Sequence, residues 1–346
     1  MPDQPPLRLT DGVRLHVESS GRPDAPLTVV LLHGWTLDGR TWHRQVGAVR
    51  EALGESVRVI TYDVRGHGRS DDTPLGSATL ARLGDDLAEV LDGLAPDGPV
   101  VLAGHSMGGM TIMEYAHRHP EAFAARVAGL VFVSTTAEGH THTSYGLPAQ
   151  AARLVRLLEV TGAAILARCG AWRPPSLLLR SLRPALRWLL FGNVCDPADI
   201  RLAASAVARA SLRSIGGFRS SIGAQRRLDT LAALGDIPAA ALVGERDKLT
   251  PVRCAESIAE ALPATALTVC AGAGHMLMLE RSEEVSAAIV AVSRRVTGVL
   301  QSALGAETKA RPTDPIRRVV HAPERPSAPA GVVPETEGKA GLAAAA

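Results

Sequence analysis

One stretch of the chain, residues 99–117, sets the main constraint on how this sequence can fold. Its first five residues are an apolar run typical of a buried strand, and its last eight have the composition of a helix. Gly104-His105-Ser106-Met107-Gly108-Gly109 joins the two. A strand that turns so sharply into a helix leaves the serine strained at the tip, and flanking glycines avoid Cβ collisions. The pattern predicts Ser106 as a nucleophile, against the alternative of a glycine-rich turn with an incidental serine.

Apolar runs alternate with helical patterns along the first 136 residues. We expect an antiparallel hairpin at 7–19, buried strands at 27–32, 57–62, 99–103 and 127–134, and helices at 41–53, 77–94 and 110–117. This alternation predicts an α/β fold, a doubly wound and mostly parallel sheet with helices on both faces. Sites in such sheets lie at the carboxyl ends of the strands, where His33, Asp63, Ser106 and Ser134 are expected.

The strand signal then stops for about a hundred residues. Helical patterns alone occupy 149–167, 176–191, 196–215 and 220–234. Strands return at 239–244 and 266–270, each followed by a helix, at 251–262 and 282–300. The sequence therefore predicts a core in two parts, 1–136 and 236–303, with a helical cap at 137–235 over the active edge of the sheet. Residues 304–346 are proline-rich and poor in apolar side chains, so we expect a disordered tail.

Charge is unevenly distributed along the chain. The net charge of the 346 residues is only +2, so no nucleic-acid partner is indicated. Between His140 and Gly235, however, thirteen arginines and no lysine face four acidic residues. Solvated helix faces are the interpretation that we favour for this arginine-rich cap. An anionic substrate or a peripheral contact with a membrane surface are the alternatives.

Targeting and cysteine patterns indicate where the protein is located and whether it needs a metal. The first residues lack the basic region and apolar core of a secretory signal. The most lipophilic stretches, such as 177–190, are interrupted by arginine and proline, so no transmembrane segment is expected. The four cysteines are scattered without a C-x-x-C pair, which argues against a zinc site or a disulfide framework. We expect a cytoplasmic protein that needs neither a metal nor another cofactor.

Two further motifs supply partners for the serine. Val243-Gly244-Glu245-Arg246-Asp247-Lys248-Leu249-Thr250-Pro251 follows one strand, and Ala271-Gly272-Ala273-Gly274-His275-Met276 follows the last. Both motifs place polar side chains at the carboxyl edge where Ser106 is expected. The chain order is Ser106, Asp247, His275.

These motifs, together with His33-Gly34-Trp35 and Asp63-Val64-Arg65-Gly66-His67-Gly68-Arg69-Ser70, resemble those of the α/β-hydrolase family. The resemblance covers about residues 7–300, with all five motifs in the family's order, whereas the cap and the tail carry none. It implies that Ser106 attacks a carbonyl carbon, that His275 moves the proton and that Asp247 orients the imidazole. It also implies that the backbone N–H groups of Trp35 and Met107 bind the oxyanion.

Several residues near these motifs have other interpretations. Glu245 and Glu138 compete with Asp247 as the acid, and the resemblance favours Asp247. Structural roles are expected for His105, for Asp63 and His67 in a stabilised turn, and for Arg65 in a buried salt bridge. His140 and His142 could suggest a metal site, but they lack carboxylate or thiol neighbours and are expected to be incidental. The aromatic residues of the cap could line a pocket or simply pack between helices; these are Tyr145, Trp172, Trp188, Phe191 and Phe218.

A serine at the turn narrows the chemistry. Relatives that open epoxides or remove halide place a carboxylate at this point, so those reactions are not expected. The stretches 33–42 and 59–63 are similar to those of cofactor-free haloperoxidases and aryl esterases. The leading hypothesis is a carboxylesterase or lipase-like hydrolase acting on a small-molecule ester. Perhydrolase, lactone, thioester or carbon–carbon bond hydrolysis on the same residues, and a ligand-sensing receptor, are the alternatives.

Overall fold

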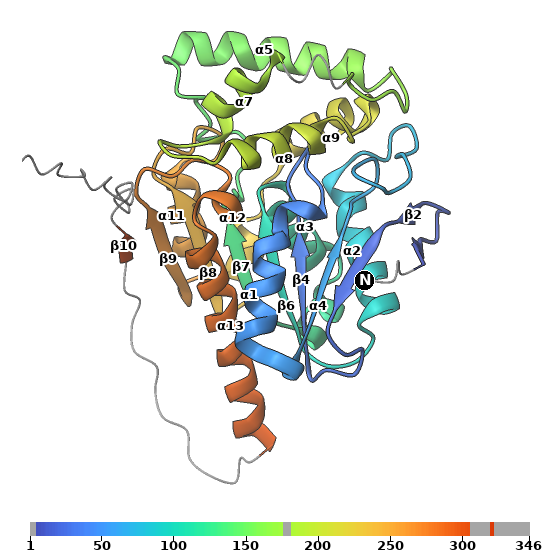
Figure 1. Ribbon diagram of the computed structural model, residues 1–346, viewed down its shortest axis with the longest axis vertical. Helices are drawn as coiled ribbons and strands as arrows, with labels where there is room; N and C mark the ends of the chain where they lie inside the picture. Colours follow the sequence, from blue (N-terminus) through green and yellow to red (C-terminus); the bar gives the residue numbers. More distant parts are fainter. Residues whose placement is uncertain (1–4, 176–180, 305–318, 322–346) are drawn as a thin grey trace, which may run out of the picture.

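The computed structural model describes residues 5–175, 181–304 and 319–321, with a central sheet in the order β10-β9-β8-β7-β6-β4-β5-β3 (Figure 1). All adjacent strands are parallel except β3, which runs antiparallel to β5. The mostly parallel sheet predicted from the sequence is therefore confirmed. The strands are β3 (Val17–Ser20), β4 (Leu27–Leu32), β5 (Val57–Tyr62), β6 (Val100–His105), β7 (Val127–Val133), β8 (Ala239–Gly244), β9 (Thr265–Cys270) and β10 (Val319–His321).

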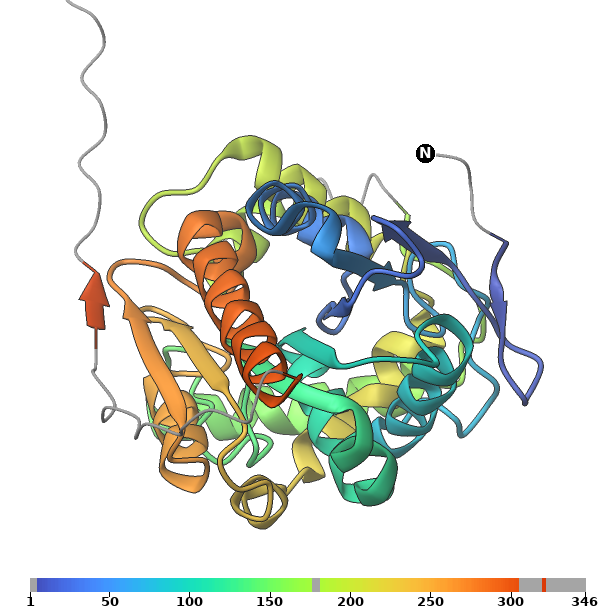
Figure 2. The ribbon, with the colours of Figure 1, turned by 90° about the horizontal axis from the view of Figure 1, so that it is seen from below.

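Helices cover both faces of the sheet and create two apolar cores. Every residue of β4, β5 and β6 is buried, which explains why these strands are continuous apolar runs rather than alternating ones. One core lies under α1 (His43–Leu53), α12 (Leu277–Glu280) and α13 (Ser282–Leu304). The other lies under α2 (Leu80–Leu94), α3 (Met107–Arg118), α4 (Pro120–Arg126) and α11 (Val252–Ala261), and Figure 2 shows the sheet between the two layers.

The amino-terminal segment forms the expected hairpin only in its first part. Strands β1 (Leu7–Arg8) and β2 (Arg14–Leu15) pair antiparallel, with Leu7 opposite Leu15. The chain then leaves the hairpin, and β3 joins the edge of the main sheet beside β5. Burial of Val17, which is 1% exposed, accounts for this second pairing. Short 3₁₀ helices at Gly39–Trp42 and Gly54–Ser56 flank α1.

Helices between β7 and β8 form a layer above the carboxyl edge of the sheet (Figure 1). They are α5 (Ala149–Leu166), α7 (Arg183–Leu190), α8 (Pro197–Val207) and α9 (Leu212–Ala224). A further helix, α10 (Leu228–Ala232), follows α9 and packs beside α3 and α11. The predicted helices at 196–215 and 220–234 are wrong in their bounds. The first ends at Val207, and Ser211 begins the next helix, α9: its side chain accepts from Ser214 N, and its own N–H donates to Gly66 O at 2.9 Å. Residues 176–180 of the predicted helix at 176–191 lie outside the described residues.

The predicted tail is described only at β10, which extends the sheet by pairing in parallel with β9. The rest of 305–346 lies outside the described residues, so its predicted disorder remains a prediction. Among the helices that the structure describes, none is long and apolar enough to cross a membrane.

Candidate active site

Ser106 occupies a sharp turn between β6 and α3. Its φ of 50° and ψ of −116° lie outside the helical and extended regions. The turn requires glycine, because a Cβ on Gly104 would lie 2.4 Å from Gly109 N and one on Gly108 would lie 2.3 Å from Leu32 O. Thr135 Oγ1 donates to Ser106 O at 2.6 Å and ties the turn to the segment after β7. The strand-to-helix turn predicted from the sequence is thus confirmed.

Asp247 and His275 are brought into direct contact by the loops after β8 and β9. His275 Nδ1 lies 2.8 Å from Asp247 Oδ2, and both side chains are buried. Asp247 Oδ1 accepts hydrogen bonds from Leu249 N and Thr250 N, each at 2.9 Å, and Oδ2 accepts one from Thr250 Oγ1 at 2.9 Å. Backbone donors therefore hold the carboxylate in a fixed orientation toward the imidazole.

His105, the residue before Ser106, links the turn at Ser106 to the loop that carries His275. His105 Nε2 lies 2.9 Å from His275 O, and the two imidazole rings are 4.8 Å apart. Burial and the nearby His275 lower the pKa of His105 well below its usual value, so this ring is neutral and its Nε2–H donates. Among the described residues, Ser106 Oγ makes no hydrogen bond to His275.

Trp35 and Met107 carry the backbone amides expected near the serine. Met107 is the first residue of α3, so its N–H has no acceptor within the helix. Trp35 follows Gly34, where an added Cβ would lie 3.2 Å from Ser106 Cβ and 2.6 Å from His105 Nδ1. The loop after β4 thus passes directly beside the serine turn. Among the described residues, the N–H groups of Trp35 and Met107 donate to no backbone carbonyl in a turn or loop.

The turn after β5 holds that loop in place. His33 Nε2 accepts from Val64 N at 3.0 Å, and His67 Nε2 accepts from Thr36 N at 3.1 Å. Asp63 accepts from Gly39 N at 2.7 Å and from Arg69 N at 2.8 Å. Burial lowers the pKa of His67 to about 3, so the imidazole is neutral and acts as an acceptor. The predicted structural roles of Asp63 and His67 are confirmed.

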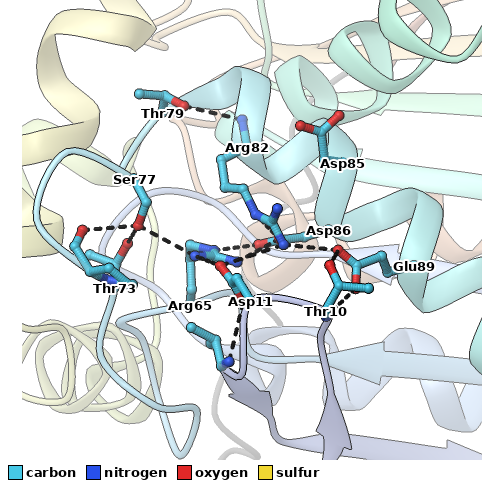
Figure 3. Close-up of polar contacts among 12 residues, drawn as sticks. Thr10, Asp11, Arg65, Thr73, Ser77, Thr79, Arg82, Asp85, Asp86 and Glu89 are labelled. Atoms are coloured by element: carbon cyan, nitrogen blue, oxygen red, sulfur yellow. Dashed lines mark hydrogen bonds and ion pairs between the residues drawn. The ribbon is translucent and has the colours of Figure 1, made fainter.

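Arg65, on the same turn, is buried in an ion-pair network (Figure 3). Its Nη2 donates to Asp86 Oδ1 of α2 at 2.7 Å, and its Nη1 lies 2.9 Å from Asp11 of the hairpin. Arg82 reaches the same Asp86 oxygen at 2.8 Å and Glu89 at 2.9 Å. The network joins the hairpin, α2 and the turn after β5, and it confirms the buried salt bridge expected for Arg65.

Comparisons with known proteins agree with this geometry. The sequence pattern described as "Alpha/beta hydrolase family" matches residues 29–288, about three quarters of the chain. The chain belongs to the alpha/beta hydrolase family. Among curated alpha/beta hydrolases, it is 27% identical over 297 residues to the AB hydrolase superfamily protein YisY of Bacillus subtilis, covering 83% of this chain and 98% of that one.

Two more proteins are similar to this chain over different shares of its length. The chain is 38% identical over 131 residues to "Probable oxidoreductase EphD" of Mycobacterium tuberculosis, but this match covers 38% of this chain and only 21% of that protein. The solved structure of a thermophilic esterase from Thermogutta terrifontis, bound to malate, superposes with a TM-score of 0.64. That esterase is 28% identical, and the superposition covers 84% of this chain and 97% of the other.

Two side chains of this alpha/beta hydrolase that support His275 were missed by the sequence reasoning. Thr250 Oγ1 lies 3.3 Å from His275 Nδ1 while it donates to Asp247. Glu280 accepts from Gly274 N at 3.0 Å, from Met276 N at 3.2 Å and from Gly192 N of the cap at 2.7 Å. Burial raises the pKa of Glu280. The Asp-x-x-Thr spacing could have indicated Thr250, whereas nothing in the pattern indicated Glu280.

The alternative acids and the cap histidines lie in other contacts. Glu245 accepts from Gly272 N at 2.8 Å, and Glu138 lies 3.0 Å from His142 Nε2. His140 contacts Arg219, and burial together with this guanidinium lowers the pKa of His140 to about 3. Across the described ranges, no group of three or more His, Cys, Asp or Glu side chains is arranged to hold a metal ion.

Cavities and cap aromatics complete the description. A cavity of about 600 Å³ lies between the cap and the Asp247 loop, lined among others by Trp188, Phe191 and Lys248. A larger one of about 950 Å³ lies at α3, α4 and α10, away from Ser106 and His275. Phe218 is fully buried 5.8 Å from the His67 ring, whereas Trp172 is 75% exposed. The cap aromatics therefore divide into packing residues, a cavity-lining pair and one solvent-facing tryptophan.

Proposed function

We propose that this alpha/beta hydrolase cleaves carboxylic esters through an acyl-enzyme formed on Ser106. The observation that carries the proposal is the 2.8 Å contact between His275 Nδ1 and Asp247 Oδ2, at the strand edge where Ser106 occupies its strained turn. A carboxylate held by backbone donors orients the imidazole with its proton on Nδ1, which leaves Nε2 free to accept a proton. This is the arrangement that activates a serine hydroxyl.

The reaction proceeds in two halves. Ser106 Oγ bonds to the ester carbonyl carbon while its proton moves to His275 Nε2; the C–O bond to the alcohol then breaks, and the alcohol leaves with that proton. In the second half, water gives a proton to His275 and its oxygen bonds to the acyl carbon. Release of the carboxylic acid returns the proton to Ser106. Throughout, Asp247 stays ionised and stabilises the imidazolium.

The negative charge that forms on the carbonyl oxygen needs donors that are already in place. We assign this role to the backbone N–H groups of Met107, at the start of α3, and of Trp35, on the loop beside Gly34. Loss of one such donor typically costs about 2.7–4 kcal/mol of transition-state stabilisation. Because backbone atoms donate, side-chain substitutions at Met107 or Trp35 test the role only indirectly.

An ester is the substrate that the similarities favour. The Thermogutta terrifontis protein, at 28% identity over most of both chains, is an esterase. Lactones, thioesters, peracid formation and bonds between carbons next to a carbonyl use the same nucleophile and base, so they belong in the same substrate panel. Which acyl group is preferred depends on the space under the cap.

Turnover of p-nitrophenyl esters of increasing acyl length tests the proposal. Ser106→Ala is expected to lower kcat by about 10⁵-fold or more, because the nucleophile is lost. Ser134→Ala is the matched control: Ser134 directly follows the neighbouring strand β7, is buried and also has a positive φ of 46°. This control should keep most of the activity. An Ser106→Ala protein as active as the wild type would refute the proposed nucleophile.

A further inference from the structure

The outermost helix of the cap, α5, presents large apolar side chains to solvent. Leu154, Leu157, Leu158 and Ile165 are 59%, 60%, 62% and 66% exposed. At 100° per residue these four positions fall on one side of the helix. Figure 1 shows that α5 is the element of the cap farthest from the sheet. No described element of the chain covers this face.

The inner side of α5 packs with small residues instead. Ala152 and Ala163 are buried. A Cβ on Gly216 of α9 would lie only 2.2 Å from Ala163 O, so the two helices cross in close contact. A surface helix normally turns its large apolar side chains toward the core and its polar ones outward. In α5 the leucines point the other way, and close packing on α9 prevents a simple rotation that would bury them.

Apolar exposure is concentrated on the cap. Ten large apolar side chains are exposed in the described residues. Nine of them lie in the cap, and one, Leu75, lies in the α/β part of the chain. The nine are Leu154, Leu157, Leu158, Val160, Ile165, Trp172, Leu182, Trp188 and Val194. Exposed apolar surface gathered in one region marks an interaction site rather than ordinary surface variation.

Positive charge surrounds this apolar face. Residues 149–191 contain seven arginines and one acidic residue, Glu159. That carboxylate is already engaged, since Tyr145 Oη donates to it at 2.6 Å and Arg219 pairs with it. Arg153 is exposed on α5, and Arg168 is exposed just after the carboxyl end of that helix. Among the described residues, the Arg168 guanidinium donates only to Ala164 O of α5. These guanidinium groups are thus available for an external anion.

We propose that the outer face of α5 and its flanking arginines dock on an anionic lipid surface. The leucines and Ile165 enter the boundary between headgroups and acyl chains, and Arg153 and Arg168 contact lipid phosphates. Charge complementarity selects this occupant, because a second copy of the chain would bring a second set of arginines to the same interface. If the proposed ester hydrolysis holds, docking places the cap and the strand edge below it next to lipid-borne esters.

Co-sedimentation with vesicles tests the docking without any catalysis. The Ser106→Ala protein is mixed with vesicles of phosphatidylcholine alone or with added phosphatidylglycerol, so failure of the proposed hydrolysis cannot affect the result. Binding is expected only with the anionic vesicles and should weaken as salt rises. Arg153→Gln with Arg168→Gln should weaken binding about fivefold per arginine. Arg8→Gln is the control, because Arg8 is exposed and lies outside the cap.

The apolar contribution is tested separately. Leu157→Ser with Leu158→Ser should weaken binding by about tenfold or more. Leu75→Ser is the control: Leu75 is 74% exposed but lies outside the cap, so this variant should bind as the unchanged protein does. An unchanged unfolding temperature shows that the variants fold. The proposal is overturned if anionic vesicles do not bind, if binding is insensitive to salt, or if Leu75→Ser matches the α5 variant. Conversion of a dimer to a monomer by the α5 variant without vesicle binding would assign the face to a second copy instead.

Discussion

Replacing Asp247 by asparagine changes one atom in the contact on which the proposed mechanism depends. Oδ1 can keep its two backbone donors, Leu249 N and Thr250 N, at 2.9 Å each. Oδ2, however, accepts from both Thr250 Oγ1 and His275 Nδ1, and an amide nitrogen in its place can accept from neither. His275 must then carry its proton on Nε2, the atom that has to accept the proton of Ser106.

The size of the effect follows from that geometry. The wrong tautomer of the base lowers kcat by about 10⁴-fold, equivalent to about 5.4 kcal/mol. Folding should suffer less, because two of the four hydrogen bonds to Asp247 survive and each lost one costs about 1 kcal/mol. The measurements are kcat on p-nitrophenyl butyrate and the urea dependence of unfolding. We expect a folded protein with almost no turnover.

Glu245→Gln is the matched control, since it removes the same charge from the same loop. Its carboxylate accepts from Gly272 N at 2.8 Å and does not contact His275. This variant should retain kcat within about tenfold. A kcat for Asp247→Asn within tenfold of the wild type would refute the reasoning. Equal losses in the two variants would refute it as well, because they would point to loop charge rather than to orientation of the imidazole.

Three further substitutions or conditions have defined outcomes. Glu280→Gln should lower kcat by about 10²-fold, because an amide nitrogen that cannot accept replaces one of the two oxygens that hold the His275 loop against the cap; steady-state kinetics measures this. Arg65→Ala should lower the free energy of unfolding by about 3 kcal/mol, since Asp86 stays buried and keeps only Arg82 as an ion-pair partner, whereas Arg14→Ala should cost less than about 1 kcal/mol; urea titration compares them. Lowering the pH from 7.5 to 5.5 should reduce the free energy of unfolding by about 1.4 kcal/mol for each of His67 and His140, measured by urea titration at both values.

The sign of the pH effect follows from the depressed pKa values. Both histidines have a folded pKa of about 3 and an unfolded value near 6.5. Between these values the unfolded chain binds protons that the folded chain does not, so stability falls as the pH falls. Equal stability at both pH values would contradict the depressed pKa values of His67 and His140.

The control for Glu280→Gln is Glu283→Gln, because Glu283 is exposed on the following helix. Equal losses of kcat in the two variants would refute the positioning role of Glu280.

The sheet could be predicted because its central strands are buried on both faces. β4 and β5 have the bounds expected from their apolar runs, as does β8. The cap was harder, because Ala-rich and Arg-rich helices give weak periodicity and few end signals. The break between α8 and α9 depends on the contact of Ser211 N with Gly66 O, which joins residues far apart in the chain. No local pattern contains that information.

The candidate site also has a part that could be predicted from the sequence and a part that could not. Each of Ser106, Asp247 and His275 could be chosen from a short motif after a strand, and the strand edge explains why they gather. The contacts that hold them come from elsewhere. Glu280 reaches Gly192 of the cap, and Arg65 reaches Asp86 and Asp11. Such partners depend on how helices pack on the sheet, which the sequence pattern does not specify.

Labelling with a fluorophosphonate tests the central claim most directly. This reagent reacts with a serine hydroxyl only when a base accepts its proton, so the reaction reports the activated nucleophile without any assumption about the substrate. Peptide mass spectrometry should find one adduct, on Ser106, that is absent from Ser106→Ala and strongly slowed in Asp247→Asn. Labelling of another serine, or an unlabelled Ser106 in a folded protein, would contradict the account.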